Sequence, residues 1–105
     1  MESGKFVTVA RAEDVSPGTV VAVQAGEEAI ALANVDGRFY AMHGVCLHLK
    51  GPLGEGKLDA NHYLTCPWHG WHYHVETGKN DFDLAIQNRT YEVRVEDGDV
   101  QVAVG

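Results

Sequence analysis

Two Cys–His motifs constrain this chain more than any other feature of its sequence. Cys46 and His48 are separated by one residue and Cys66 and His69 by two, with the segment 49–65 between the motifs. Thiolate and imidazole suit zinc, copper and iron–sulfur centres. The chain has 2 cysteines in all, so these side chains provide two thiolates and two imidazoles for a four-ligand site. The sequence therefore predicts two loops that meet at one metal centre.

The residues that flank the motifs match a known family. Cys-x-His followed at this distance by Cys-x-x-His resembles the motif of Rieske proteins, in which two cysteines bind one iron of a [2Fe–2S] cluster and two histidines bind the other. Gly51-Pro52-Leu53, Pro67 and Gly70 stand where Rieske proteins have the same residues. Small or rigid residues there let backbone N–H groups approach the cluster sulfurs. Several spaced elements coincide, which makes the resemblance more specific than a lone Cys-x-x-His.

The resemblance implies one [2Fe–2S] cluster per chain and assigns a role to each ligand. Cys46 and Cys66 correspond to the thiolates on the inner iron, and His48 and His69 to the imidazoles on the outer iron. Neutral imidazoles in place of two thiolates make an added electron easier to accept, so the potential is expected in the Rieske range of roughly −150 to +300 mV. Structural zinc, which also accepts two cysteines and two histidines, is the alternative for these residues.

Two aromatic residues after the second motif are the expected modulators of the potential. High-potential Rieske proteins place a serine hydroxyl near a bridging sulfide and a tyrosine hydroxyl on a ligand sulfur, and the matching residues here are Trp71 and Tyr73. Trp71 cannot replace the serine, whereas Tyr73 keeps its hydroxyl, so we expect a potential toward the low end of the Rieske range, raised somewhat by Tyr73. A core tyrosine with a solvated hydroxyl is the alternative. His72 and His74 alternate with these aromatics and are expected at the surface.

Short segments of alternating or β-branched apolar residues predict an all-β chain without helices. Asp36-Gly37 and Asp97-Gly98 are signals of two-residue hairpins. Strands are expected over 5–10, 19–24, 29–35, 38–42, 57–60, 63–65, 71–75, 89–96 and 100–104.

The expected fold is a Rieske-type small antiparallel β-sandwich, which is also what the resemblance implies. At this length, residues 1–105 form a single domain, with a cluster-binding subdomain of two loops at about 43–78. The segment 79–88 has no clear pattern, and it lacks the proline that the family usually places near the cluster. How this segment covers the cluster is therefore left open by the sequence.

Charge and composition narrow the partners and the location. The net charge is −7 and the pI is about 5.2, which disfavours nucleic acid and anionic membrane surfaces as partners. The sequence has no apolar run long enough for a membrane span and no signal peptide. Both cysteines are assigned to the cluster, so no structural disulfide is expected. We therefore expect a cytoplasmic protein without a membrane anchor, unlike the quinol-oxidising Rieske subunits.

A cluster without a flavin motif, a substrate pocket or a mononuclear iron site predicts an electron-transfer protein rather than an enzyme. The resemblance implies a Rieske-type ferredoxin that carries electrons from a flavin-dependent NAD(P)H reductase to a terminal oxygenase through transient complexes. The second hypothesis is a small subunit held tightly by a larger reductase, such as nitrite reductase. The third is a structural zinc-binding module.

Overall fold

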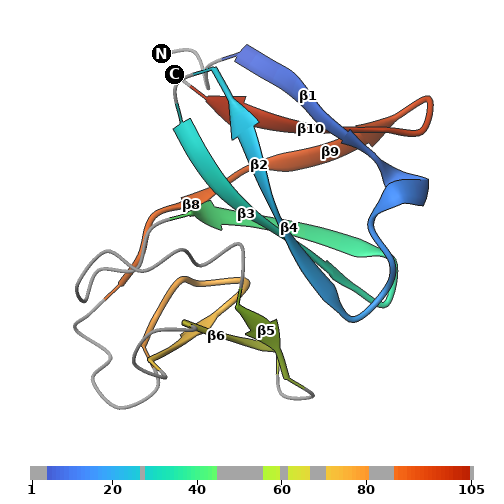
Figure 1. Ribbon diagram of the computed structural model, residues 1–105. Helices are drawn as coiled ribbons and strands as arrows, with labels where there is room; N and C mark the ends of the chain where they lie inside the picture. Colours follow the sequence, from blue (N-terminus) through green and yellow to red (C-terminus); the bar gives the residue numbers. More distant parts are fainter. Residues whose placement is uncertain are drawn as a thin grey trace.

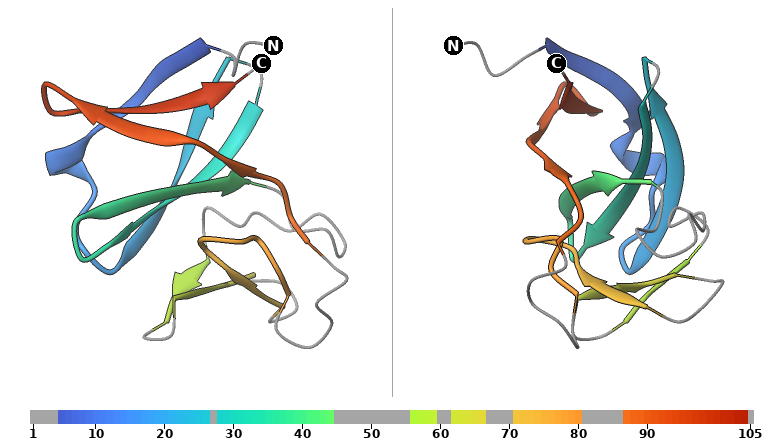
Figure 2. Two further views of the ribbon diagram at one scale, coloured as in Figure 1. Left: turned by 180° about the vertical axis from the view of Figure 1, so that it is seen from behind. Right: turned by 90° about the vertical axis from the view of Figure 1, so that its left-hand side faces the viewer.

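The computed structural model describes residues 5–26, 28–44, 56–59, 62–66, 71–80 and 87–104. Within these ranges the chain forms three antiparallel sheets and one short 3₁₀ helix, η1 (Ala12–Asp14), so the expected all-β fold is confirmed. Figure 1 and Figure 2 show two sheets packed together and the third at one end of the molecule. None of the described helical residues makes up a segment long and apolar enough to cross a membrane.

Ladder pairing defines the order of strands in each sheet. The first sheet has the order β1-β10-β9, with β1 at Lys5–Arg11, β9 at Val93–Glu96 and β10 at Asp99–Val104. The second has the order β2-β3-β4-β8, with β2 at Thr19–Ala25, β3 at Glu28–Val35, β4 at Arg38–His43 and β8 at Thr90–Tyr91. The third has the order β5-β6-β7, with β5 at Lys57–Leu58, β6 at Tyr63–Thr65 and β7 at His72–His74.

The central strand β3 is buried on both faces. Ile30 and Leu32 belong to a core shared with Val100 and Val102 of the first sheet. Their neighbours on the opposite face belong to a second core, shared with β6 and β7 of the third sheet; they are Ala31, Ala33 and Val35. A strand covered on both sides needs a continuous apolar run, which explains why this part of the sequence does not alternate.

Both predicted hairpin turns are confirmed. Asp36 and Gly37 have φ values of 51° and 93°, and Asp97 and Gly98 have values of 53° and 80°. Positive φ at both central residues is the requirement of the type I′ turn, whose twist matches that of the strands on either side. The turns join β3 to β4 and β9 to β10.

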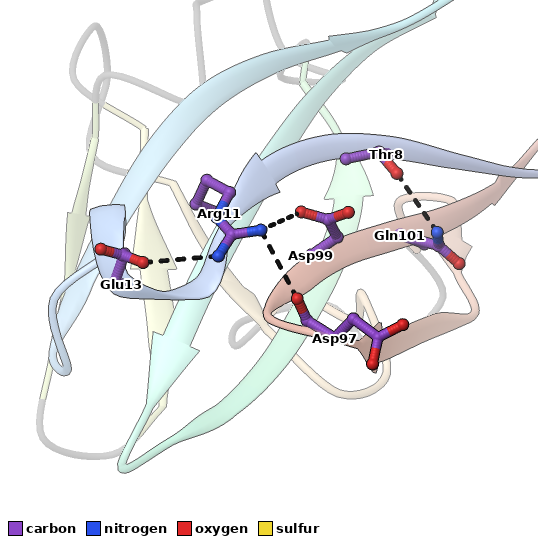
Figure 3. A network of polar contacts seen from close by, with 6 residues as sticks. All are labelled: Thr8, Arg11, Glu13, Asp97, Asp99 and Gln101. Atoms are coloured by element: carbon purple, nitrogen blue, oxygen red, sulfur yellow. Dashed lines mark hydrogen bonds and ion pairs between the residues drawn. The ribbon is translucent and has the colours of Figure 1, made fainter.

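Polar side chains attach the hairpin of β9 and β10 to the end of β1 (Figure 3). Nη1 of Arg11 donates to Oδ1 of Asp99 at 2.7 Å and to the backbone oxygen of Asp97 at 3.5 Å. Nη2 of Arg11 lies 3.5 Å from a carboxylate oxygen of Glu13. Exposed ion pairs of this kind add little stability, so the hairpin depends mainly on its backbone ladder and on the apolar core.

Three expected strands differ in the structure, and the one predicted over 71–75 is limited to His72–His74. The strand predicted over 89–96 is divided at Glu92, because Thr90–Tyr91 pairs with β4 whereas Val93–Glu96 pairs with β10. The chain passes from one sheet to another at this point, so a single alternating pattern serves two sheets. The strand predicted over 57–60 ends at Leu58 among the described residues, because its ladder with β6 includes Lys57 and Leu58 but not Asp59; residue 60 lies outside the described residues.

The ends of the segment 79–88 are described, and they pack against the third sheet. Asn80 forms an isolated bridge with Tyr73, and Lys79 forms one with Gln87. Residues 81–86 lie outside the described residues, so the covering of the cluster by this segment remains open. The boundaries of the single domain and of the subdomain at about 43–78 stay predictions.

The turn after β7 gives a test of this packing. Gly78 has a φ of 76°, and a Cβ there would overlap the backbone carbonyl oxygen of Asn88. Gly37 has a φ of 93° with open space around the same position. We expect Gly37→Ala to lower the free energy of unfolding by about 1–2 kcal/mol, because L-residues disfavour positive φ. Gly78→Ala should lower it by a further 1–3 kcal/mol or so, because of the steric overlap.

The measurement is urea unfolding of both variants beside the wild-type protein, followed by far-UV circular dichroism. Equal losses in the two variants would show that the close approach of Gly78 to Asn88 is wrong.

Candidate metal centre

The structure places one of the four predicted ligands. Cys66 follows β6 directly and is 1% exposed. Its N–H donates to the backbone oxygen of Trp71 at 2.8 Å, which extends the β6–β7 pairing by one residue pair. His69 belongs to the segment 67–70, which we call the second ligand segment. Cys46 and His48 belong to the first ligand segment, 45–55; all three residues lie outside the described residues.

The surroundings of Cys66 fit a buried cluster ligand. Its side chain belongs to the second core, which lies between β3 and the third sheet, together with Leu64 and Tyr73. An unpaired thiolate in such a core would be costly, whereas a metal centre that binds the sulfur stabilises its charge. The donor set in the sequence, two thiolates and two imidazoles, is also the set that a Rieske cluster requires. The residues present therefore fit a [2Fe–2S] cluster.

Tyr73 and Trp71 lie on the same face as Cys66. Tyr73 is opposite Leu64 in the ladder, so Cys66 is its diagonal neighbour on the adjacent strand, within the reach of an aromatic side chain. Tyr73 is fully buried, and Trp71 is half-buried against the same core. The part played by the Tyr73 hydroxyl and by Trp71 at the cluster stays a prediction.

The histidines of β7 face the other way, as expected, but they are half-buried rather than fully exposed. The ring of Tyr63 lies across this face, with its centroid 5.1 Å from the ring of His74 and 6.4 Å from the ring of His72. These rings therefore form an outer layer on the third sheet, on the side opposite Cys66.

The two residues just before the first ligand segment are fixed by backbone contacts. The N–H of His43 donates to the oxygen of Arg89 at 2.8 Å, and the N–H of Gly44 donates to the oxygen of Ala29 at 2.8 Å. A Cβ at Gly44 would lie 2.9 Å from the carbonyl carbon of Ala29, so only glycine fits here without displacing the backbone. Nδ2 of Asn88 also donates to the oxygen of His43, at 3.0 Å. The direction in which the chain leaves β4 is therefore set before the first ligand.

A polar cluster lies beside these contacts. The hydroxyl of Tyr91 donates to Oε1 of Glu28 at 2.8 Å, and Nη1 of Arg89 lies 3.7 Å from the same oxygen. The guanidinium of Arg89 also stacks 4.7 Å above the centroid of the Tyr91 ring. Burial, and then the hydrogen bond to Glu28, raise the pKa of Tyr91 from 10.0 to about 12. The neutral phenol is thus the form that the folded protein stabilises.

Sequence reasoning missed four residues that shape this region: Glu28, Gly44, Asn80 and Asn88. Asn80 and Asn88 are 0% and 2% exposed, and they lie in the segment that showed no pattern. Asparagine is typical of turns, so nothing in the sequence marked either of them as buried. Gly44 gave a weak signal, because glycine at the end of a strand often marks a close approach of two backbones. Glu28 gave none, since its partner is 63 positions away in the sequence.

The raised pKa of Tyr91 predicts how stability depends on pH. The contribution of the neutral phenol is fully present below the unfolded pKa of 10.0 and is lost as the pH rises through about 12. We therefore expect the wild-type protein to lose more unfolding free energy than Tyr91→Phe between about pH 9 and pH 11. Urea unfolding of both proteins at the two pH values measures this difference. Lysine deprotonation is common to both proteins, so parallel losses would contradict the prediction.

Comparison with known proteins completes the description of the site. The model of the Rieske [2Fe-2S] domain family matches residues 5–102. The ferredoxin component of the alkene monooxygenase system of Xanthobacter autotrophicus is 30% identical over 98 residues, which cover 93% of this chain and 80% of the relative. The ferredoxin component of biphenyl 2,3-dioxygenase of Rhodococcus jostii is 33% identical over 90 residues, 85% of this chain and 83% of the relative.

The solved structures agree with the sequence comparisons. A chain from the complex of reduced oxygenase and oxidized ferredoxin in carbazole 1,9a-dioxygenase matches with a TM-score of 0.83 and 34% identity, over 93% of this chain and 92% of that chain. The family match covers nearly the whole sequence, including both Cys–His motifs. The chain therefore belongs to the Rieske [2Fe–2S] domain family, as a Rieske-type ferredoxin whose cofactor is a [2Fe–2S] cluster.

Proposed function

We propose that this protein carries single electrons from a flavin-dependent NAD(P)H reductase to a terminal oxygenase, and that it is not itself an enzyme. The observation that carries the proposal is its match, over most of both chains, to ferredoxin components of an alkene monooxygenase and of a biphenyl dioxygenase. The complex of oxygenase and ferredoxin in carbazole 1,9a-dioxygenase supports the oxygenase as a partner. The reductase is proposed from the chemistry, because a one-electron carrier needs a donor that divides the hydride of NAD(P)H into single electrons.

The ligand set is part of the proposal. Cys46 and Cys66 would hold the inner iron, and His48 and His69 the outer iron, of a cluster that supplies reversible one-electron uptake when bound. Cys66 is directed by its place at the end of β6 and by its N–H bond to Trp71. The apolar core around it keeps water from the sulfur. The acidic surface favours partners that present basic residues, and the cytoplasmic location stays a prediction.

The first test is the metal content and redox behaviour of the purified protein. We expect two irons and two sulfides per chain and a reversible one-electron wave within roughly −150 to +300 mV. Cys66→Ala should lose the cluster, because a thiolate ligand is removed. Addition of a reductase, NAD(P)H and an aromatic-ring oxygenase should give product with the wild-type protein and none with Cys66→Ala. Bound zinc and the absence of a wave would overturn the electron-carrier function.

The second test concerns Tyr73. If its hydroxyl donates to a cluster sulfur, Tyr73→Phe lowers the midpoint potential, because a hydrogen bond that stabilises the reduced, more negative cluster is lost. Tyr63→Phe is the matched control, since Tyr63 stands on the same sheet but faces His74 instead of the core. Protein-film voltammetry compares the two variants with the wild-type protein. An unchanged potential in Tyr73→Phe would leave Tyr73 as a core aromatic only.

A further inference from the structure

A buried asparagine connects the two parts of the chain that lead to the ligands. Asn88 is 2% exposed. Its Nδ2 donates to the backbone oxygen of His43 at 3.0 Å, and its backbone N–H donates to the oxygen of Gly78 at 2.7 Å. His43 ends β4 just before the first ligand segment, and Gly78 closes the turn after β7, the strand that follows the second ligand segment. One residue thus holds both parts.

The backbone groups that Asn88 contacts, at Gly78 and at His43, are themselves held by further contacts. The N–H of Gly78 donates to the oxygen of His74 at 2.7 Å, which ties the turn to the end of β7. Gly78 approaches the Asn88 carbonyl so closely that no side chain fits between them. On the other side, His43 is held at both its N–H and its oxygen, by Arg89 and Asn88 respectively. A continuous path of hydrogen bonds, made by the Asn88 side chain on one side and by backbone groups on the other, therefore runs from β4 through Asn88 to β7.

Apolar packing alone does not provide this connection. The second core, between β3 and the third sheet, includes Met42 of β4 together with Leu64 and Tyr73. Burial of these side chains therefore brings β4 and the third sheet together. The hydrophobic effect has no preferred direction, whereas a hydrogen bond weakens steeply when its angle changes. Two hydrogen bonds supply that direction at the end of β4: the backbone bond from His43 to Arg89, and the bond from the Asn88 amide to His43.

We propose that Asn88 is a positioning residue for the [2Fe–2S] cluster, which fixes the first ligand segment relative to the second. The proposal rests on the ligand set of the proposed function, in which each Cys–His motif contributes its thiolate to the inner iron and its imidazole to the outer iron. A shift of one segment against the other would change the orientation of the ligands at both irons. Outer partners of this kind tune metal affinity and redox properties without touching the metal.

The chain contains a matched control for Asn88. Asn34 of β3 is 3% exposed, and its Nδ2 donates to the oxygen of Val15 at 2.7 Å, so it too is a buried amide that joins distant backbone segments. By alternation along β3, it lies on the face opposite Ala33 and Val35 and therefore away from the third sheet. Asparagine to aspartate removes the donor and keeps the shape at either position. If Asn88 has only a structural role, the loss of unfolding free energy and the effect on the cluster should therefore be similar in the two variants.

The experiment compares Asn88→Asp and Asn34→Asp in the protein that holds its cluster. We expect both variants to be less stable to urea. Only Asn88→Asp should change the EPR g values of the reduced cluster and the midpoint potential, and it should release iron to a chelator about tenfold faster than Asn34→Asp, as is typical when an outer partner of a metal site is lost. If either aspartate variant fails to fold, Asn88→Ser and Asn34→Ser replace the pair, because serine is smaller and carries no buried charge.

The outcomes separate this proposal from the proposed function. An Asn88 variant with wild-type g values, potential and iron release, at the same loss of stability as its Asn34 counterpart, would overturn the positioning role. Equal changes in both variants would do the same. A wild-type protein without a Rieske EPR signal, or a Cys66→Ala variant that keeps one, would instead overturn the ligand set. A change confined to the Asn88 variant supports the proposal.

Discussion

The structure depends on one strand that is buried on both of its faces. Ile30 and Leu32 of β3 pack toward the first sheet, and Ala31 and Ala33 pack toward the third. Cys66 is buried in the core that these small alanines share with the third sheet. The same strand also accepts the N–H of Gly44 at the start of the first ligand segment. The placement of Cys66 therefore follows from the packing of β3 and the third sheet.

Apolar and polar contacts have separate tasks in this arrangement. Burial of the two cores supplies most of the stabilisation, at roughly 25 cal/mol per Å² of apolar surface removed from water. The polar contacts add less net stability, but a buried donor or acceptor that loses its partner costs about 1–3 kcal/mol. The amides of Asn80 and Asn88 donate to backbone oxygens of His72 and His43, so a displacement of these strands would leave buried donors and acceptors without partners. Packing brings the sheets together, and these hydrogen bonds penalise other relative positions.

The sequence predicted those features that are local or that have a fixed spacing. The Asp-Gly turns, most of the strands, and the placement of His72 and His74 on the face opposite Tyr73 all follow from short periodicities. It did not predict the division at Glu92, because alternation is the same whichever sheet a strand joins. Nor did it predict the hydrogen bond from Asn88 to His43, which is 45 positions away in the sequence. Contacts of that kind depend on the tertiary structure, and a polar residue that is buried in one fold looks like a turn residue in the sequence.

An electron carrier places a particular demand on this architecture. It accepts and releases one charge at the same site in every cycle, so its ligands must suit both redox states without a rearrangement between them. Preorganised donors and dipoles meet this demand because they are fixed by the fold and need no reorganisation when the charge changes. Here the thiol of Cys66 is held in a core, the chain before the first ligand segment is bound at His43 and Gly44, and Asn88 links that chain to the hairpin of the second. These fixed contacts suit electron transfer, since a frame without them would have to rearrange at each transfer.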